Sequence, residues 1–103
     1  MNFCKYYRLD GHTPVECDMF EYAKYFEDKT LRKVALDTIG GTMVSTVFLG
    51  TDHRHVPGGP PILFETMIFG GPHDEYQERF CTWDEAVAGH AAALKLAQEA
   101  SCK

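Results

Sequence analysis

Two β-rich runs joined by Gly40-Gly41 constrain the fold of this chain more than any other feature. A two-residue glycine loop can adopt the positive φ of a primed turn, so residues 32–39 and 42–50 predict a tight hairpin in which Ile39 pairs with Thr42. In that register one face carries Val34, Leu36, Met43, Val47 and Leu49, and the other carries Lys33, Ala35, Asp37, Val44, Thr46 and Phe48. The first set is the more apolar, so we expect it to face the helices.

Capping patterns mark the starts of two helices. Asp18 with a glutamate three residues later predicts a short amphipathic helix over residues 19–28. The capping box at residues 82–85 predicts a second helix that ends near residue 100. Because glycine is unfavourable inside a helix, Gly89 predicts a close approach of the helix backbone to the sheet.

Three further runs, at residues 5–9, 62–69 and 76–81, read as strands. Hairpin-linked strands pair antiparallel, and two amphipathic helices need a sheet face to cover. We therefore expect a single α+β domain over residues 1–103. It should be a two-layer sandwich with an antiparallel sheet of about four strands and two helices packed on one face. The other face would expose Phe48 with Phe64 or Phe69, which suits a homodimer or a ligand.

Composition excludes several classes of protein. With 45% hydrophobic and 24% charged residues the chain is an ordinary globular domain, and its net charge of −5 argues against general nucleic-acid binding. No apolar run approaches the roughly 18 residues of a membrane span, and the N-terminus lacks a signal-peptide layout. We therefore expect a cytoplasmic protein without membrane contact. The cysteines occur singly and should be reduced there; they are Cys4, Cys17, Cys81 and Cys102.

The densest polar cluster lies in the loop over residues 51–61. Asp52, His53 and Arg54 come shortly before the flexible pair Gly58-Gly59. A guanidinium beside glycine amides can hold a phosphate, so we consider these five residues candidate ligand-binding residues. The alternative is a solvated loop tip, because loops collect polar side chains whether or not they bind anything.

Three other side chains are candidates for the same site. Glu65 interrupts an apolar strand, so it either faces a pocket with a partner or points out of an exposed sheet face. His73 lies in a second Gly/Pro-rich loop, and His90 lies on the apolar stripe of the last helix. A lone histidine on such a stripe is more often a core residue than a ligand.

Nucleophile-elbow, phosphate-loop and dinucleotide motifs are missing, which favours a binding module over an enzyme, with no cofactor. The alternative is a small metal-dependent hydrolase or nuclease that uses His53, His55, Glu65 and His90. The sequence does not decide whether any metal binds.

Residues 44–50 (VSTVFLG), Asp52-His53 and residues 58–71 (GGPPILFETMIFGG) resemble a family of small uncharacterised proteins found in bacteriophage genomes and bacterial prophages. The likeness extends to residues 6–11 and to residues 82–90. It implies a phage accessory protein in the bacterial cytoplasm. Such a protein would bind a host protein or a small nucleotide signal, in an anti-defence role. A minor virion or assembly component is a further alternative.

Overall fold

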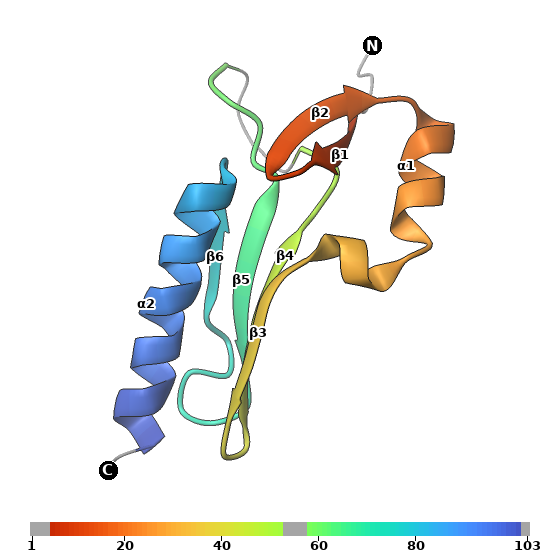
Figure 1. Cartoon of the computed structure of the whole chain (residues 1–103). Helices are drawn as coiled ribbons and strands as arrows, with labels where there is room; N and C mark the ends of the chain where they lie inside the picture. The colour runs from red at the N-terminus through yellow and green to blue at the C-terminus, as the bar shows by residue number, and fades with distance from the viewer. Residues whose placement is uncertain (1–4, 53–57, 102–103) are drawn as a thin grey trace.

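Two antiparallel sheets, two α-helices and a short 3₁₀ turn make up the described part of the protein (Figure 1). The computed structural model describes residues 5–52 and 58–101. In chain order the elements are β1 (Tyr6–Asp10), β2 (Thr13–Cys17), α1 (Met19–Phe26), the 3₁₀ turn η1 (Lys29–Arg32), β3 (Lys33–Ile39), β4 (Thr42–Phe48), β5 (Phe64–Phe69), β6 (Gln77–Phe80) and α2 (Trp83–Ser101). The predicted α+β class and the four-stranded antiparallel sheet are confirmed.

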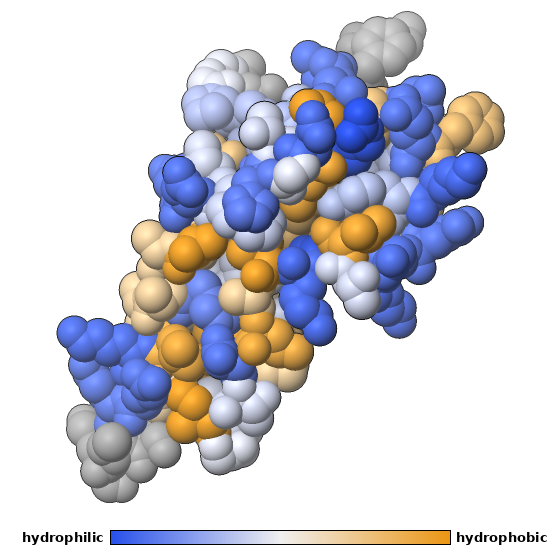
Figure 2. All heavy atoms as spheres, in the orientation of Figure 1, coloured by the Kyte–Doolittle hydropathy of each residue, from blue (hydrophilic) through white to orange (hydrophobic). Residues whose placement is uncertain are grey.

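The main sheet has the strand order β3-β4-β5-β6, and α2 lies along one of its faces (Figure 1). The predicted pairing of Ile39 with Thr42 is confirmed, and Gly40 adopts the positive φ of 58° that a primed turn needs at its first position. Val44 and Ile68 from the sheet pack against alanines of α2 in the core. Figure 2 shows hydrophobic residues emerging in separate groups between hydrophilic ones.

The prediction of which hairpin face meets the helices is wrong. Thr46 and Phe48 lie on the α2 side with 0% and 1% exposure, whereas Leu36 on the opposite face is 43% exposed. The reason lies in the next strand: Phe64 pairs with Phe48 and brings the larger apolar surface to that side. Phe48 and Phe64 are therefore core residues, and of the three aromatics expected on the open face only Phe69 is exposed there.

The β1–β2 hairpin and α1 lie at one end of the main sheet, away from the β3–β4 turn (Figure 1). The backbone N–H of Tyr7 donates to the carbonyl of Gly50 at 2.8 Å, which ties β1 to the chain leaving β4. Side chains of α1 reach the core of the covered face, because Tyr25 and Phe26 pack on Phe48. Strand β2 was not expected, because Pro14 suggests a break rather than a strand.

The predicted helix starts are confirmed. The Asp18 carboxylate accepts from the Glu21 N–H at 2.8 Å, and Thr82 and Glu85 form a reciprocal capping box. The close approach predicted at Gly89 is also present: a Cβ there would lie 2.0 Å from the Phe80 ring. Any side chain at this position would require the Phe80 ring or the helix to shift.

No helix in residues 5–52 and 58–101 is long and apolar enough to cross a membrane. Cys17 is a free thiol, the Cys81 thiol donates to the carbonyl of Pro60 at 3.9 Å, and Cys4 and Cys102 lie outside the described residues. Burial, followed by the nearby Glu21 carboxylate, raises the pKa of the Cys17 thiol, so this residue is a poor nucleophile at neutral pH.

Candidate functional site

The predicted loop site is only partly described. Asp52 accepts a hydrogen bond from the backbone N–H of Ile62 at 2.9 Å and so joins the two ends of the loop. Gly58 and Gly59 are exposed at the loop surface. His53, Arg54 and His55 lie outside the described residues, so their expected roles as ligands stay predictions.

Glu65 lies on the open face of the sheet and has partners of its own. Its carboxylate accepts from Arg79 Nε at 2.9 Å and from Gln77 Nε2 at 2.5 Å. Arg79 is its direct neighbour on β6, and the Glu65 side chain is only 12% exposed. The carboxylate is thus paired between β5 and β6. These contacts give Glu65 a role in the sheet and do not require a ligand.

The structure does not bring the described candidates to one common site. The side chain of His90 projects from α2 onto the covered face of the sheet, whereas Glu65 lies on the open face. Asp52 precedes β5 and His73 follows it, so these two residues lie at opposite ends of one strand. The expected convergence is therefore wrong for these four residues, because the pleat alternates side chains between faces and antiparallel connections alternate between ends.

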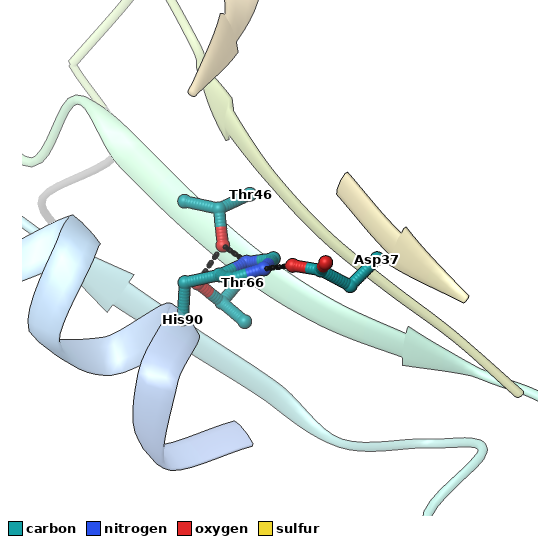
Figure 3. A network of polar contacts seen from close by, with 4 residues as sticks. All are labelled: Asp37, Thr46, Thr66 and His90. Atoms are coloured by element: carbon teal, nitrogen blue, oxygen red, sulfur yellow. Dashed lines mark hydrogen bonds and ion pairs between the residues drawn. The ribbon is translucent and has the colours of Figure 1, made fainter. Parts of the chain in front are cut away.

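His90 instead joins a buried polar network (Figure 3). Its Nδ1 lies 2.7 Å from the Thr46 hydroxyl, and its Nε2 lies 2.8 Å from a carboxylate oxygen of Asp37. The Thr46 hydroxyl in turn lies 2.5 Å from that of Thr66, its direct cross-strand neighbour. An imidazole protonated on Nε2 satisfies every contact: it donates to Asp37 and accepts from Thr46, which accepts from Thr66.

Hydroxyl, imidazole and carboxylate in this order are also the parts of a nucleophile-activating triad. Here, however, Thr46 and Thr66 are both 0% exposed and His90 is 6% exposed. A substrate cannot reach either hydroxyl while α2 stays on the sheet. The network therefore joins α2 to three strands of the sheet, and the interpretation of His90 as a core residue is the better one.

A different group of residues surrounds a hollow of about 240 Å³ where η1 meets β4. Three of its lining residues are cationic, namely Lys29, Arg32 and Lys33. Ser45 supplies a hydroxyl, and the rest of the lining is apolar, including Val47. We call this site the basic hollow. It opens on the same sheet face as Ser45 and Val47, opposite α2.

Among the described residues, the cations of the basic hollow have no ion-pair partner. In the part of the chain that the structure describes, Lys29, Arg32 and Lys33 form no ion pair. Arg32 places its guanidinium carbon 5.0 Å from the centre of the Phe26 ring. Its Nε is buried and has no hydrogen-bond partner, which is rare for a buried donor.

Local hydrogen bonds hold η1 in place. The Asp28 carboxylate accepts from the backbone N–H of Thr30 at 2.9 Å and from its hydroxyl at 2.6 Å. The hydroxyl bond, followed by the backbone bond, lowers the pKa of Asp28. The Tyr25 hydroxyl donates to the carbonyl of Leu31 at 2.7 Å. These contacts fix the turn that carries two of the three cations.

Sequence reasoning missed the basic hollow. The available signal was a short cationic run: Lys29, Arg32 and Lys33 are three of only ten basic residues, and they fall within five positions of an acidic chain. The sequence shows the three charges but not the other residues that line the hollow with them. Ser45 and Val47 come to the same hollow only through the pairing of β3 with β4.

Among residues 5–52 and 58–101, no three histidine, cysteine, aspartate or glutamate side chains come together in a way that could hold a metal ion. The metal-dependent hydrolase alternative thus gains no support from Glu65 or His90. No protein-family model matches this chain, and no curated protein or solved structure is significantly similar to it.

Proposed function

We propose that this protein is a non-enzymatic binding module that takes a small organic anion in the basic hollow. One observation carries the proposal: three cations without ion-pair partners line an apolar hollow in a chain of net charge −5, and one of them, Arg32, has a buried Nε without a hydrogen-bond partner. Two other polar groups of the sheet do have partners within the protein: Glu65 is paired with Arg79, and Asp37 accepts from His90.

An anion would complete what the basic hollow lacks. A buried donor without an acceptor costs about 1–3 kcal/mol, and an anion that draws the Arg32 side chain toward the hollow, where its Nε can donate, would remove that cost. The same oxygen would offset the mutual repulsion of Lys29, Arg32 and Lys33. The apolar lining would cover the uncharged part of the ligand, as in most small-molecule sites.

The resemblance to phage and prophage proteins supplies a setting for this proposal. In that setting the module would act inside the bacterial host by sequestering a small signal, which fits an anti-defence role. Of the partners expected from the sequence, the small nucleotide ligand fits the basic hollow best, because it combines a charged phosphate with an aromatic base whose faces can contact apolar side chains. The host-protein and virion alternatives have no comparable observation in their favour.

Calorimetric titration with phenyl phosphate and benzoate tests the proposal. We expect at least one of them to bind with Kd below about 1 mM, and Arg32→Gln to weaken that binding about tenfold. Lys95→Gln removes one positive charge from the exposed side of α2 and is the matched control. If neither anion binds at about 10 mM, or if both variants weaken binding equally, the proposal is wrong.

A further inference from the structure

We infer that the anionic group held in the basic hollow is a phosphate monoester, carried on a small apolar or single-ring body. This inference rests on the function proposed above and names the chemical class of its ligand. The choice lies between a carboxylate, a singly charged phosphate diester and a doubly charged monoester. The number, arrangement and chemistry of the donors favour the last of these.

The number of donors exceeds what a carboxylate needs. One arginine can satisfy both oxygens of a carboxylate through its planar fork. Around the basic hollow, Arg32 is joined by two lysine ammonium groups and by the hydroxyl of Ser45. A phosphate monoester offers three terminal acceptor oxygens and carries almost two negative charges at neutral pH, so it can use all of these groups.

The donors also come from different elements, which suits a tetrahedral group better than a planar one. Arg32 ends η1, Lys33 begins β3, and Ser45 lies within β4. Lys33 is the cross-strand neighbour of Val47, so a cation and an apolar side chain stand beside each other at the lining. A ligand with a charged end and an apolar end can use both.

The size of the hollow limits the body of the ligand. Its volume of about 240 Å³ lies below the roughly 300–1,000 Å³ of sites that enclose drug-sized molecules. It has room for a phosphoryl group and part of a ring, whereas a dinucleotide would remain mostly outside. Apolar contact would come from Val47 and Leu49.

A pH signature distinguishes a monoester from the other two classes. A phosphate monoester gains its second negative charge near pH 6, whereas a diester or a carboxylate keeps one charge from pH 5 to 8. The charged groups facing the hollow are Lys29 and Arg32 from η1 and Lys33 from β3, while α1 and β4 contribute none. Among the lining residues that the structure describes there is no carboxylate or imidazole, the side chains that commonly titrate in this range.

The test measures the affinity of three probes, phenyl phosphate, methyl phenyl phosphate and benzoate, at pH 5 and pH 7.5. We expect phenyl phosphate to bind about tenfold tighter than the other two at pH 7.5, and to lose about tenfold of its affinity at pH 5. The diester and benzoate should change little between the two pH values.

Two results would overturn the inference. If benzoate or the diester binds as tightly as phenyl phosphate, or if phenyl phosphate shows no pH dependence, the monoester class is wrong while the anion-binding function stands. If none of the three probes binds, the function itself is wrong. The outcomes are therefore distinguishable.

A variant of Lys33 distinguishes specific binding of a phosphate monoester from a general electrostatic attraction to any anion. Lys33→Gln should weaken phenyl phosphate more than benzoate, because the second charge needs the additional cation, while Lys95→Gln should weaken neither. Equal weakening of both probes by Lys33→Gln would count against the inference. Adding 5′-AMP and glucose 6-phosphate as probes then separates a nucleotide from a sugar phosphate as the source of the monoester.

Discussion

The protein contains two groups of polar side chains that face opposite ways across β4, and they differ in how far their hydrogen bonds are satisfied. Under α2, the imidazole of His90 has a partner at each nitrogen, and Thr46 and Thr66 also pair with each other. In the basic hollow, Arg32 Nε is buried without a partner. The first group is closed to solvent, and each of its hydrogen-bonding groups has a partner. The second group borders a hollow and includes a donor that has no acceptor.

This difference gives a way to distinguish polar side chains that support the fold from polar side chains that are available to a ligand. A buried polar group that is fully satisfied from within contributes to the fold, and there is nothing left for a ligand to complete. A cluster of like charges with a missing acceptor contributes little to the fold and leaves an interaction for a partner to make. By this criterion His90 belongs to the architecture, and Arg32 belongs to the proposed anion site.

The largest expected effect is that of removing the imidazole. His90→Ala should lower the free energy of unfolding by about 2–4 kcal/mol, because it leaves a cavity and removes the contacts to Thr46 and Asp37. Urea denaturation measures the change. A loss below about 0.5 kcal/mol would show that the network does not support the fold.

A milder change isolates the hydrogen bonds from the packing. Thr46→Val keeps the shape of the side chain but leaves His90 Nδ1 buried without its partner, so we expect a loss of about 1–3 kcal/mol in the free energy of unfolding. Thr38→Val, at an exposed position of β3, is the control and should change stability by less than about 0.5 kcal/mol. If the two variants lose similar amounts of free energy of unfolding, the network does not have the structural role given to it here.

Tyr25 is expected to have a smaller, pH-dependent effect. Burial raises the pKa of its hydroxyl, which donates to Leu31. A raised folded pKa means that the contribution to stability is complete below about pH 10 and is lost as the pH rises further. Tyr25→Phe should cost about 0.5–1.5 kcal/mol at pH 7 and should reduce the loss of stability in alkali. Denaturation of both proteins at pH 8 and pH 11 checks this, and identical alkaline profiles would contradict it.

The smallest effect on stability is expected in the basic hollow. Arg32→Gln removes a buried donor that has no acceptor but also removes the contact of the guanidinium with the Phe26 ring, and because these two effects oppose each other, the free energy of unfolding should change by less than about 1 kcal/mol even though anion binding weakens. Thermal unfolding without and with phenyl phosphate measures both quantities. A large loss of stability without ligand would place Arg32 with the structural group and remove the contrast.

Much of the fold follows from local patterns. The Gly40 turn, the Asp18 cap and the close approach at Gly89 each depend on residues near in sequence, and all three are present. The choice of covered face could not be obtained in this way, because it depends on Phe64 in another strand. Pro14 hid β2 for a similar reason: its pairing with Leu9 becomes visible only in the hairpin.

The site was harder to predict than the fold. Glu65 and His90 were recognised as unusual, but their partners Arg79 and Asp37 lie 14 and 53 positions away, and no local pattern joins them. The cations of the basic hollow were visible as residues without being recognised as a site. A site of this kind depends on which charges remain unpaired after folding, and that requires the three-dimensional structure.

The direct opposition of Thr46 and Thr66 also bears on how the sheet finds its alignment. If β4 slipped by one position against β5, Ser45 or Val47 would replace Thr46 opposite Thr66, and the imidazole of α2 would lose its hydroxyl partner in the protein interior. The contact with His90 thus makes a misaligned pairing of β4 with β5 less stable than the native one. One polar contact between distant parts of the chain can select a single arrangement where apolar packing alone would tolerate neighbouring ones.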